Sequence, residues 1–240
     1  MDYGLVVISN DPPDAFTCCS LYISKNEINA SVVMSLIDDR MRELISLPEP
    51  RSVLDILAFT HALILLQIMR LFDGDIRSLA TADEILTALE SSAITLLQSL
   101  FIPDQSPTDI FSLSMYPIGE FWESWVLQES ARRTVLFAFY FINIFRLLQA
   151  KAPVQCDRNY SLSGEHAFYF SAHLWEAQNA FDFAIAWAER KHFIVYNLDF
   201  SSALQTAQPE DVDAFGRMLL VTLLGIDEAK AWFHVRGAIL

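Results

Sequence analysis

The sequence has little glycine, little cysteine and few basic residues. Glycine occupies only 7 of the 240 positions, whereas phenylalanine occupies 18. Few glycines, together with many leucines, alanines and phenylalanines, favour helices over a turn-rich β fold. Hydrophobic residues make up 53% of the chain and charged residues 19%. This composition predicts a large apolar core and argues against a disordered chain.

The three cysteines are Cys18, Cys19 and Cys156, too few and too unevenly spaced for a disulfide framework. They fit a reducing compartment, in which a buried thiol is ordinary. The N-terminal stretch MDYGLVVISNDPPD has no basic flank and only a short apolar run. We therefore do not expect it to be a secretory signal.

Basic residues are outnumbered by acidic ones, 16 to 30, so the formal net charge is −14. Proteins bind nucleic acids largely through lysines and arginines that release counterions from the phosphates. The longest basic runs are RR at 132–133 and ERKH at 189–192. Direct binding to DNA or RNA is not expected, and neither is binding to an anionic membrane surface.

Two apolar stretches, 53–72 and 135–145, are the candidates for membrane spans. A span needs about 20 mostly uncharged residues. The second stretch is too short, and the first contains polar or charged residues at Asp55, His61, Gln67 and Arg70. Both are interpreted as buried helices, and no membrane contact is expected.

Apolar residues recur at helical spacing along most of the chain. The predicted helices lie near 26–47, 53–72, 81–101, 118–150, 164–192 and 209–237. We expect one all-α domain over 1–240, in two helical halves at about 1–101 and 118–240, joined by a proline-rich loop at 102–117. The run 192–198 is predicted to be a strand or the end of a buried helix.

Several local patterns predict where these helices start and stop. Ser24 to Glu27 and Thr81 to Glu84 have the spacing of capping boxes. Pro209 suits a first helical turn, and Gly225 suits a stop or a kink. Asp73-Gly74-Asp75 is interpreted as the turn after the second helix, because a lone pair of carboxylates offers too few ligands for a hard cation.

Asp38 and Asp39 begin a stretch, DDRMRE, that faintly resembles the aspartate-rich helix of class I terpene cyclases. The second metal-binding motif of that family has no counterpart downstream. Adjacent residues also point about 100° apart on a helix. We interpret the stretch as a solvated helix face on which Asp39, Glu43 and the arginines pair.

No motif in the sequence assigns a catalytic residue, a metal ligand or a cofactor, and ligand-binding residues stay unknown. The histidines are His61, His166, His173, His192 and His234, none with metal-ligand spacing. His166 and His173 fall on one predicted helix face, but a zinc site would need at least one more ligand. A pairing of Cys156 with a histidine stays open, because such sites assemble in space.

The segment 121–141, FWESWVLQESARRTVLFAFYF, places charges within an apolar helix. One stripe of this helix is formed by Trp122, Trp125, Glu129, Arg132, Arg133 and Leu136. Glu129 reaches both arginines at i+3 and i+4, and an arginine can stack on an indole while binding a carboxylate. We interpret the group as a paired polar clamp at a helix–helix crossing. An arginine-lined anion pocket is the alternative.

Three segments resemble one known family. AFTHALILLQIMRLFDGDIRSLATADEILTALESSAITLLQSL at 58–100 is similar to a leucine-rich helix and turn of fungal zinc-cluster transcription factors. The segment 121–141 resembles their Trp-x-x-Trp, Glu-Ser, Arg-Arg-Thr pattern, and LWEAQNAFDFAIAW at 174–187 resembles their Leu-Trp-Glu-Ala segment. The matches occur in the family's order and correspond to the fungal transcription factor domain, or middle homology region.

The resemblance implies an all-helical regulatory domain in the nucleus, and not an enzyme. The zinc cluster of that family needs six cysteines beside basic residues, and this sequence has neither. His61-Ala62-Leu63 stands where the family has Gln-Ala-Leu, and 156–173 lacks the family's usual proline turn. Basic nuclear localisation runs are also missing.

Three hypotheses follow. In the first, the protein regulates transcription, for example of a fungal metabolite gene cluster, through contacts with a full-length zinc-cluster factor or other transcription components, and responds to a small-molecule effector. In the second, the helical domain has been recruited as a small-molecule-binding protein or an enzyme, with aromatic side chains near Arg133, His166 and His173. In the third, the gene model is truncated and upstream exons encode the zinc cluster.

Overall fold

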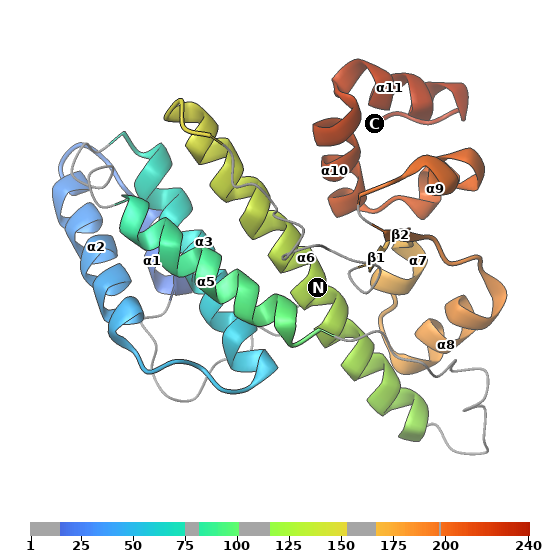
Figure 1. Cartoon of the computed structure of the whole chain (residues 1–240), viewed down its shortest axis with the longest axis horizontal. Helices are drawn as coiled ribbons and strands as arrows, with labels where there is room; N and C mark the ends of the chain where they lie inside the picture. Colours follow the sequence, from blue (N-terminus) through green and yellow to red (C-terminus); the bar gives the residue numbers. More distant parts are fainter. Residues whose placement is uncertain (1–14, 75–81, 101–115, 153–166, 197) are drawn as a thin grey trace. The chain divides into compact units, whose positions relative to one another are not determined.

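The computed structural model describes residues 15–74, 82–100, 116–152, 167–196 and 198–240. In these residues nearly all regular structure is helical, which confirms the predicted all-α class (Figure 1). The chain packs as two compact units, the first formed by 1–99 and 134–154 and the second by 100–133 and 155–240. Residues 134–154 therefore pack with the first unit, although they follow the predicted linker. The assignment of one domain stays a prediction.

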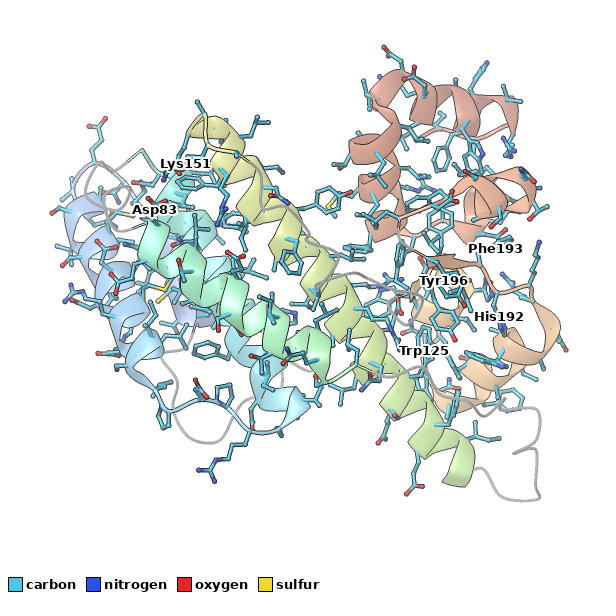
Figure 2. The ribbon with its side chains drawn as sticks, viewed as in Figure 1. Asp83, Trp125, Lys151, His192, Phe193 and Tyr196 are labelled. Carbon is cyan, nitrogen blue, oxygen red and sulfur yellow. The ribbon has the colours of Figure 1, made fainter. Side chains whose placement is uncertain are left out.

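The first unit is a helical bundle. Its elements are α1 (Ala15–Ile23), α2 (Ala30–Ser46), α3 (Val53–Phe72), α5 (Ala82–Gln98) and the part of α6 (Tyr116–Leu148) that follows residue 133. Leucines, isoleucines and methionines at helical spacing form its core, with Ile37, Leu63 and Leu89 fully buried. At its surface Lys151 donates to both carboxylate oxygens of Asp83, at 2.8 and 2.6 Å (Figure 2).

Helix α3 has the predicted bounds. Ser52 caps its first turn, because the Ser52 hydroxyl accepts from the amide of Asp55 at 3.1 Å. At the other end Gly74 has a φ of 86°, a conformation that glycine adopts at little cost. Asp73 forms an ion pair with Lys25. The turn interpretation of Asp73-Gly74 is thus confirmed, whereas Asp75 lies outside the described residues.

The predicted capping box at Ser24 is wrong. The Ser24 hydroxyl instead donates to the carbonyl of Leu21 at 2.8 Å, at the end of α1, a helix that the sequence patterns do not predict. Helix α2 begins four residues later than predicted, after Asn29, whose side chain accepts from the amide of Asn26 at 2.7 Å. The asparagines thus form a turn between the two helices. The predicted box at Thr81 lies outside the described residues.

The second unit combines short helices with a two-stranded sheet. Its elements are residues 116–133 of α6, β1 (Ala167–Tyr169), α7 (Ala172–Trp175), α8 (Ala180–Glu189), β2 (Ile194–Tyr196), α9 (Ser201–Thr206), the 3₁₀ turn η3 (Pro209–Asp211), α10 (Ala214–Leu224) and α11 (Ile226–Val235). Strands β1 and β2 are antiparallel, with Phe168 opposite Val195. The strand option for 192–198 is therefore confirmed.

The single helix predicted over 164–192 is wrong, because this part contains β1, α7 and α8. Hydrogen bonds to a distant segment replace helical ones: the Phe170 amide donates to the Phe193 carbonyl at 2.7 Å, and the Phe193 amide donates to the Ser171 hydroxyl at 2.8 Å. Asn179 then starts α8 by accepting from the amide of Asp182 at 2.9 Å. Local periodicity does not reveal such long-range pairing.

The helix predicted over 209–237 is divided into three elements. Pro209 occupies the first turn of η3, as expected. Gly225, with a φ of 90°, separates α10 from α11 and confirms the predicted kink. Gly216 in α10 has a packing role instead, because a Cβ atom there would lie 2.6 Å from Cε2 of Phe170.

Of the helices in the described residues, α3 alone is long and apolar enough to cross a membrane by length and composition. Half of the most apolar 18-residue stretch of this helix is buried inside the protein, as expected for a core helix of a bundle. Arg70 near its end is buried and donates from Nε to Asp38 at 2.6 Å. The expectation that the protein makes no membrane contact stays a prediction.

Candidate functional site

The second unit contains a buried group of charges, here called the Glu129 cluster, which consists of Glu129, Arg132, Arg133 and Asp213. All four residues have exposed fractions of 6% or less. The first three lie on α6, and Asp213 is the N-cap residue of α10. Two carboxyl groups and two guanidinium groups can neutralise one another, which is the condition for burying charge at a tolerable cost.

Arg133 makes three polar contacts within this unit. Its Nε donates to Glu129 Oε1 at 2.9 Å, one Nη pairs with Asp213 Oδ2, and the other Nη donates to the carbonyl of Tyr169 at 3.2 Å. Arg132 Nη1 lies 3.5 Å from Glu129 Oε2. The predicted pairing of Glu129 with both arginines is confirmed.

Glu129 is also bound by the main chain of β1. The amide of Tyr169 lies 3.1 and 3.3 Å from the two carboxylate oxygens and donates to them. Burial raises the pKa of Glu129, while Arg133, Arg132 and the Tyr169 amide counteract this effect by stabilising the carboxylate. The carboxylate is therefore held by two cations and one backbone donor.

Aromatic rings enclose the guanidinium group of Arg133. The ring of Trp175 lies 4.1 Å from Arg133 Cζ and the ring of Phe215 lies 5.2 Å from it. The predicted stacking on an indole is confirmed, but the tryptophan comes from α7. On α6 itself, Trp125, which is labelled in Figure 2, packs against Tyr169 and Phe183, with ring centroids 5.4 and 5.0 Å away.

These contacts correct the predicted helix–helix clamp. The Glu129 cluster joins α6 to β1, to α7 and to the first turn of α10. Sequence reasoning missed Asp213, Tyr169 and Trp175 as partners. The cap of α10 had a local signal, since Asp213 accepts from the amide of Gly216 at 2.8 Å in the usual N-cap spacing. No local signal relates Asp213 to Arg133, which lies 80 positions earlier.

The acidic stretch of α2 has the predicted surface pairs. Arg42 donates to Asp39 at 2.7 Å and Arg40 donates to Glu43 at 2.6 Å. Asp38 points elsewhere and binds the buried Arg70 of α3. The charged side chains of α2 thus pair with one another at the surface and, through Asp38, with a buried arginine of α3.

Two histidines of the second unit lie close to each other. The side chain of His173 in α7 is 4% exposed, and its Nδ1 lies 3.8 Å from Asp211 Oδ1. The ring centroid of His192 is 6.4 Å from that of His173, and the His192 ring packs at a tilt against the ring of Trp187, with centroids 4.3 Å apart. Burial, the largest cause, lowers the pKa of His173 to about 4.

The other sequence candidates do not join this group. His61 shares a hydrogen bond with the Thr134 hydroxyl at 2.7 Å in the first unit, and His234 lies in the last turn of α11. His166 and Cys156 lie outside the described residues. Within the described part of the chain, histidine, cysteine and acidic side chains form no group of three or more that could hold a metal ion.

Comparison with known proteins finds a relative that matches most of the chain. No protein-family model matches the chain, and no solved structure matches it. The protein described as "Transcription factor gsfR2" from Penicillium aethiopicum is 27% identical to it over 223 residues. This match covers 91% of the chain but 52% of the relative, so the chain spans about half of that protein's length. The chain is thus related to a fungal transcription factor over most of its own length.

Proposed function

We propose that this chain is a regulatory portion of a fungal transcription regulator of the zinc-cluster type and acts through protein contacts. The observation that carries the proposal is the similarity to gsfR2, which extends over 91% of the chain. A match of that extent supports a relationship over most of the chain and is longer than a shared motif. A transcription-factor relative also favours a non-enzymatic role.

The packing of the second unit supports the same proposal. The segments 121–141 and 174–187, which resemble the fungal transcription factor domain, lie apart in sequence but meet where Trp175 stacks on Arg133. A tryptophan of one segment and an arginine of the other thus belong to the same buried contact. The third resembling segment, 58–100, contributes α3 and α5, which pack against each other in the first unit.

The charge of the chain favours proteins over nucleic acids as partners. With a net charge of −14, it would repel a phosphate backbone. We propose a full-length zinc-cluster factor or another transcription component as the partner, in the nucleus, with a small-molecule effector as a further regulator. Control of a metabolite gene cluster extends this proposal and rests on the family resemblance.

A fusion experiment tests the proposal directly. The full chain would be joined to an unrelated DNA-binding domain and expressed with a reporter gene that carries the matching sites. We expect reporter transcription to change several-fold relative to the DNA-binding domain alone. A folded, nuclear fusion that leaves the reporter unchanged, together with no zinc-cluster factor recovered by co-immunoprecipitation, would contradict the proposal.

A second candidate function is the binding or conversion of a small molecule. It is favoured by the aromatic surroundings of Trp122, whose indole nitrogen is buried without a hydrogen-bond partner among the described residues. Deletion of the gene distinguishes the two functions. Loss of an enzyme accumulates one intermediate while transcripts stay unchanged, whereas loss of a regulator lowers the transcripts of several genes together.

A further inference from the structure

The side chain of His173 is buried, and its ring nitrogens lack hydrogen-bond partners in the described part of the chain. Its side chain is 4% exposed, and neither ring nitrogen has a hydrogen-bond partner among the described residues. The nearest carboxylate, Asp211 Oδ1, is 3.8 Å from Nδ1, too far for a hydrogen bond. A neutral imidazole tolerates these surroundings better than an imidazolium ion, which carries a charge and two donors.

The polar neighbours of His173 make hydrogen bonds of their own. The other carboxylate oxygen of Asp211 accepts from the amide of Gln208 at 2.8 Å and closes η3. His192 shares a hydrogen bond between its Nε2 and the carbonyl of Trp187 at 2.8 Å. The charged group of Arg190 also acts on His173 and opposes its protonation, as does His192. A proton on His173 would therefore face one carboxylate, one cation and one second histidine.

The contact between His173 of α7 and Asp211 of η3 lies next to the Glu129 cluster. His173 precedes Trp175 by two residues in α7, and Trp175 stacks on Arg133. Asp211 precedes Asp213 by two residues, and Asp213 forms an ion pair with Arg133. The contact between α7 and η3 thus lies directly beside two of the partners that hold Arg133.

We propose that His173, Asp211 and His192 form an acid-sensitive contact between α7 and η3, and that uptake of a proton by His173 loosens Trp175 and Asp213 from Arg133. The contact is closed while His173 is neutral. Its opening exposes the Glu129 cluster and changes the surface that the second unit presents. This regulatory device is independent of the identity of the transcription partner.

The direction of the pH response follows from the shift of His173. Burial lowers its pKa in the folded protein to about 4, against an ordinary value of 6.5. The closed state therefore has its full stability above pH 6.5 and loses it as the pH falls toward 4. At pH 5 the equilibrium constant for local opening should be about 10- to 30-fold larger than at pH 7.

Hydrogen–deuterium exchange of the full chain at pH 7 and pH 5, corrected for intrinsic exchange rates, tests the proposal. We expect the amides of α7, η3 and the first turn of α10 to lose protection at pH 5, while those of α3 and α5 keep it. In the His173→Phe variant, which keeps an uncharged ring, this loss should be absent. The His234→Phe variant, altered at an exposed histidine, should respond like the parent.

Direct titration keeps the proposal testable if His173→Phe does not fold. Nuclear magnetic resonance of the histidine rings should show His173 protonating well below pH 6. A pKa near 6.5 for His173 would overturn the proposal. Equal loss of protection in the parent and in folded His173→Phe would overturn it as well.

Discussion

Arg133 and Asp213 form an ion pair inside the second unit although 80 positions separate them in the chain. The same guanidinium group donates to Glu129 one helical turn earlier on α6. Asp213 in turn caps α10 through its other carboxylate oxygen. One arginine thus joins the centre of a long helix to the start of another.

Replacement of Glu129 by alanine should destabilise the fold. Two buried arginines and the Tyr169 amide would lose their contacts with the Glu129 carboxylate, and removal of one member of a buried charge pair costs about 3–5 kcal/mol. Urea unfolding followed by circular dichroism measures the change. Glu123→Ala, at an exposed position of the same helix, should lie within about 0.5 kcal/mol of the parent. Equal stability of Glu129→Ala and the parent would show that the Glu129 cluster is not structural.

Two substitutions at Asp213 separate its two roles. In the Asp213→Asn variant the side-chain amide oxygen can still cap α10, so this variant loses mainly the charge that pairs with Arg133. The Asp213→Ala variant loses the cap as well and should be less stable than Asp213→Asn by about 1 kcal/mol. Free energies of unfolding for both variants test this order. If the two variants are equally stable, the cap contributes nothing measurable.

Gly216→Ala should destabilise the second unit even though alanine is the better helix former. Its Cβ would lie 2.6 Å from the ring of Phe170, which is 1% exposed and has little room to move. Overpacking of this kind costs about 1–3 kcal/mol. Gly119→Ala in α6 is the matched control, since nothing lies within 4 Å of its Cβ position. It should be stabilising by up to about 1 kcal/mol, and thermal unfolding of the two variants should therefore shift in opposite directions.

Two arginine–aspartate pairs of the first unit should differ strongly in their contribution to stability. The Arg70 side chain is 4% exposed and binds Asp38 at 2.6 Å, whereas the Arg42 side chain is 75% exposed and binds Asp39 at 2.7 Å. Arg70→Ala should cost about 3 kcal/mol or more, because it opens the core and leaves Asp38 without this cation.

Arg42→Ala should cost less than about 0.5 kcal/mol, because solvent and salt screen an exposed pair. Chemical denaturation at low and high salt distinguishes the two cases. We expect only the Arg42 pair to weaken with added salt. A similar cost for both variants would mean that burial does not govern the strength of these pairs.

The sequence by itself determined those features that depend on neighbouring residues. The 3.6-residue period of apolar side chains located α3 with its observed bounds, and located α5 and α6 to within a few residues. The pairing of Glu129 with Arg132 and Arg133 followed from i+3 and i+4 spacing on one helix. Gly225 and Pro209 had their expected roles because each residue restricts or frees the backbone locally.

Only the tertiary structure decided the features that depend on distant partners. Residues 164–192 contain β1, α7 and α8, because Phe170 and Ser171 bond to Phe193 in preference to their helical neighbours. Asp213 and Trp175 likewise contact Arg133 from segments that are distant in the sequence. A contact across 80 positions leaves no periodic trace in the sequence. Its stability comes from burial and charge neutralisation, and these conditions exist only once the chain has packed.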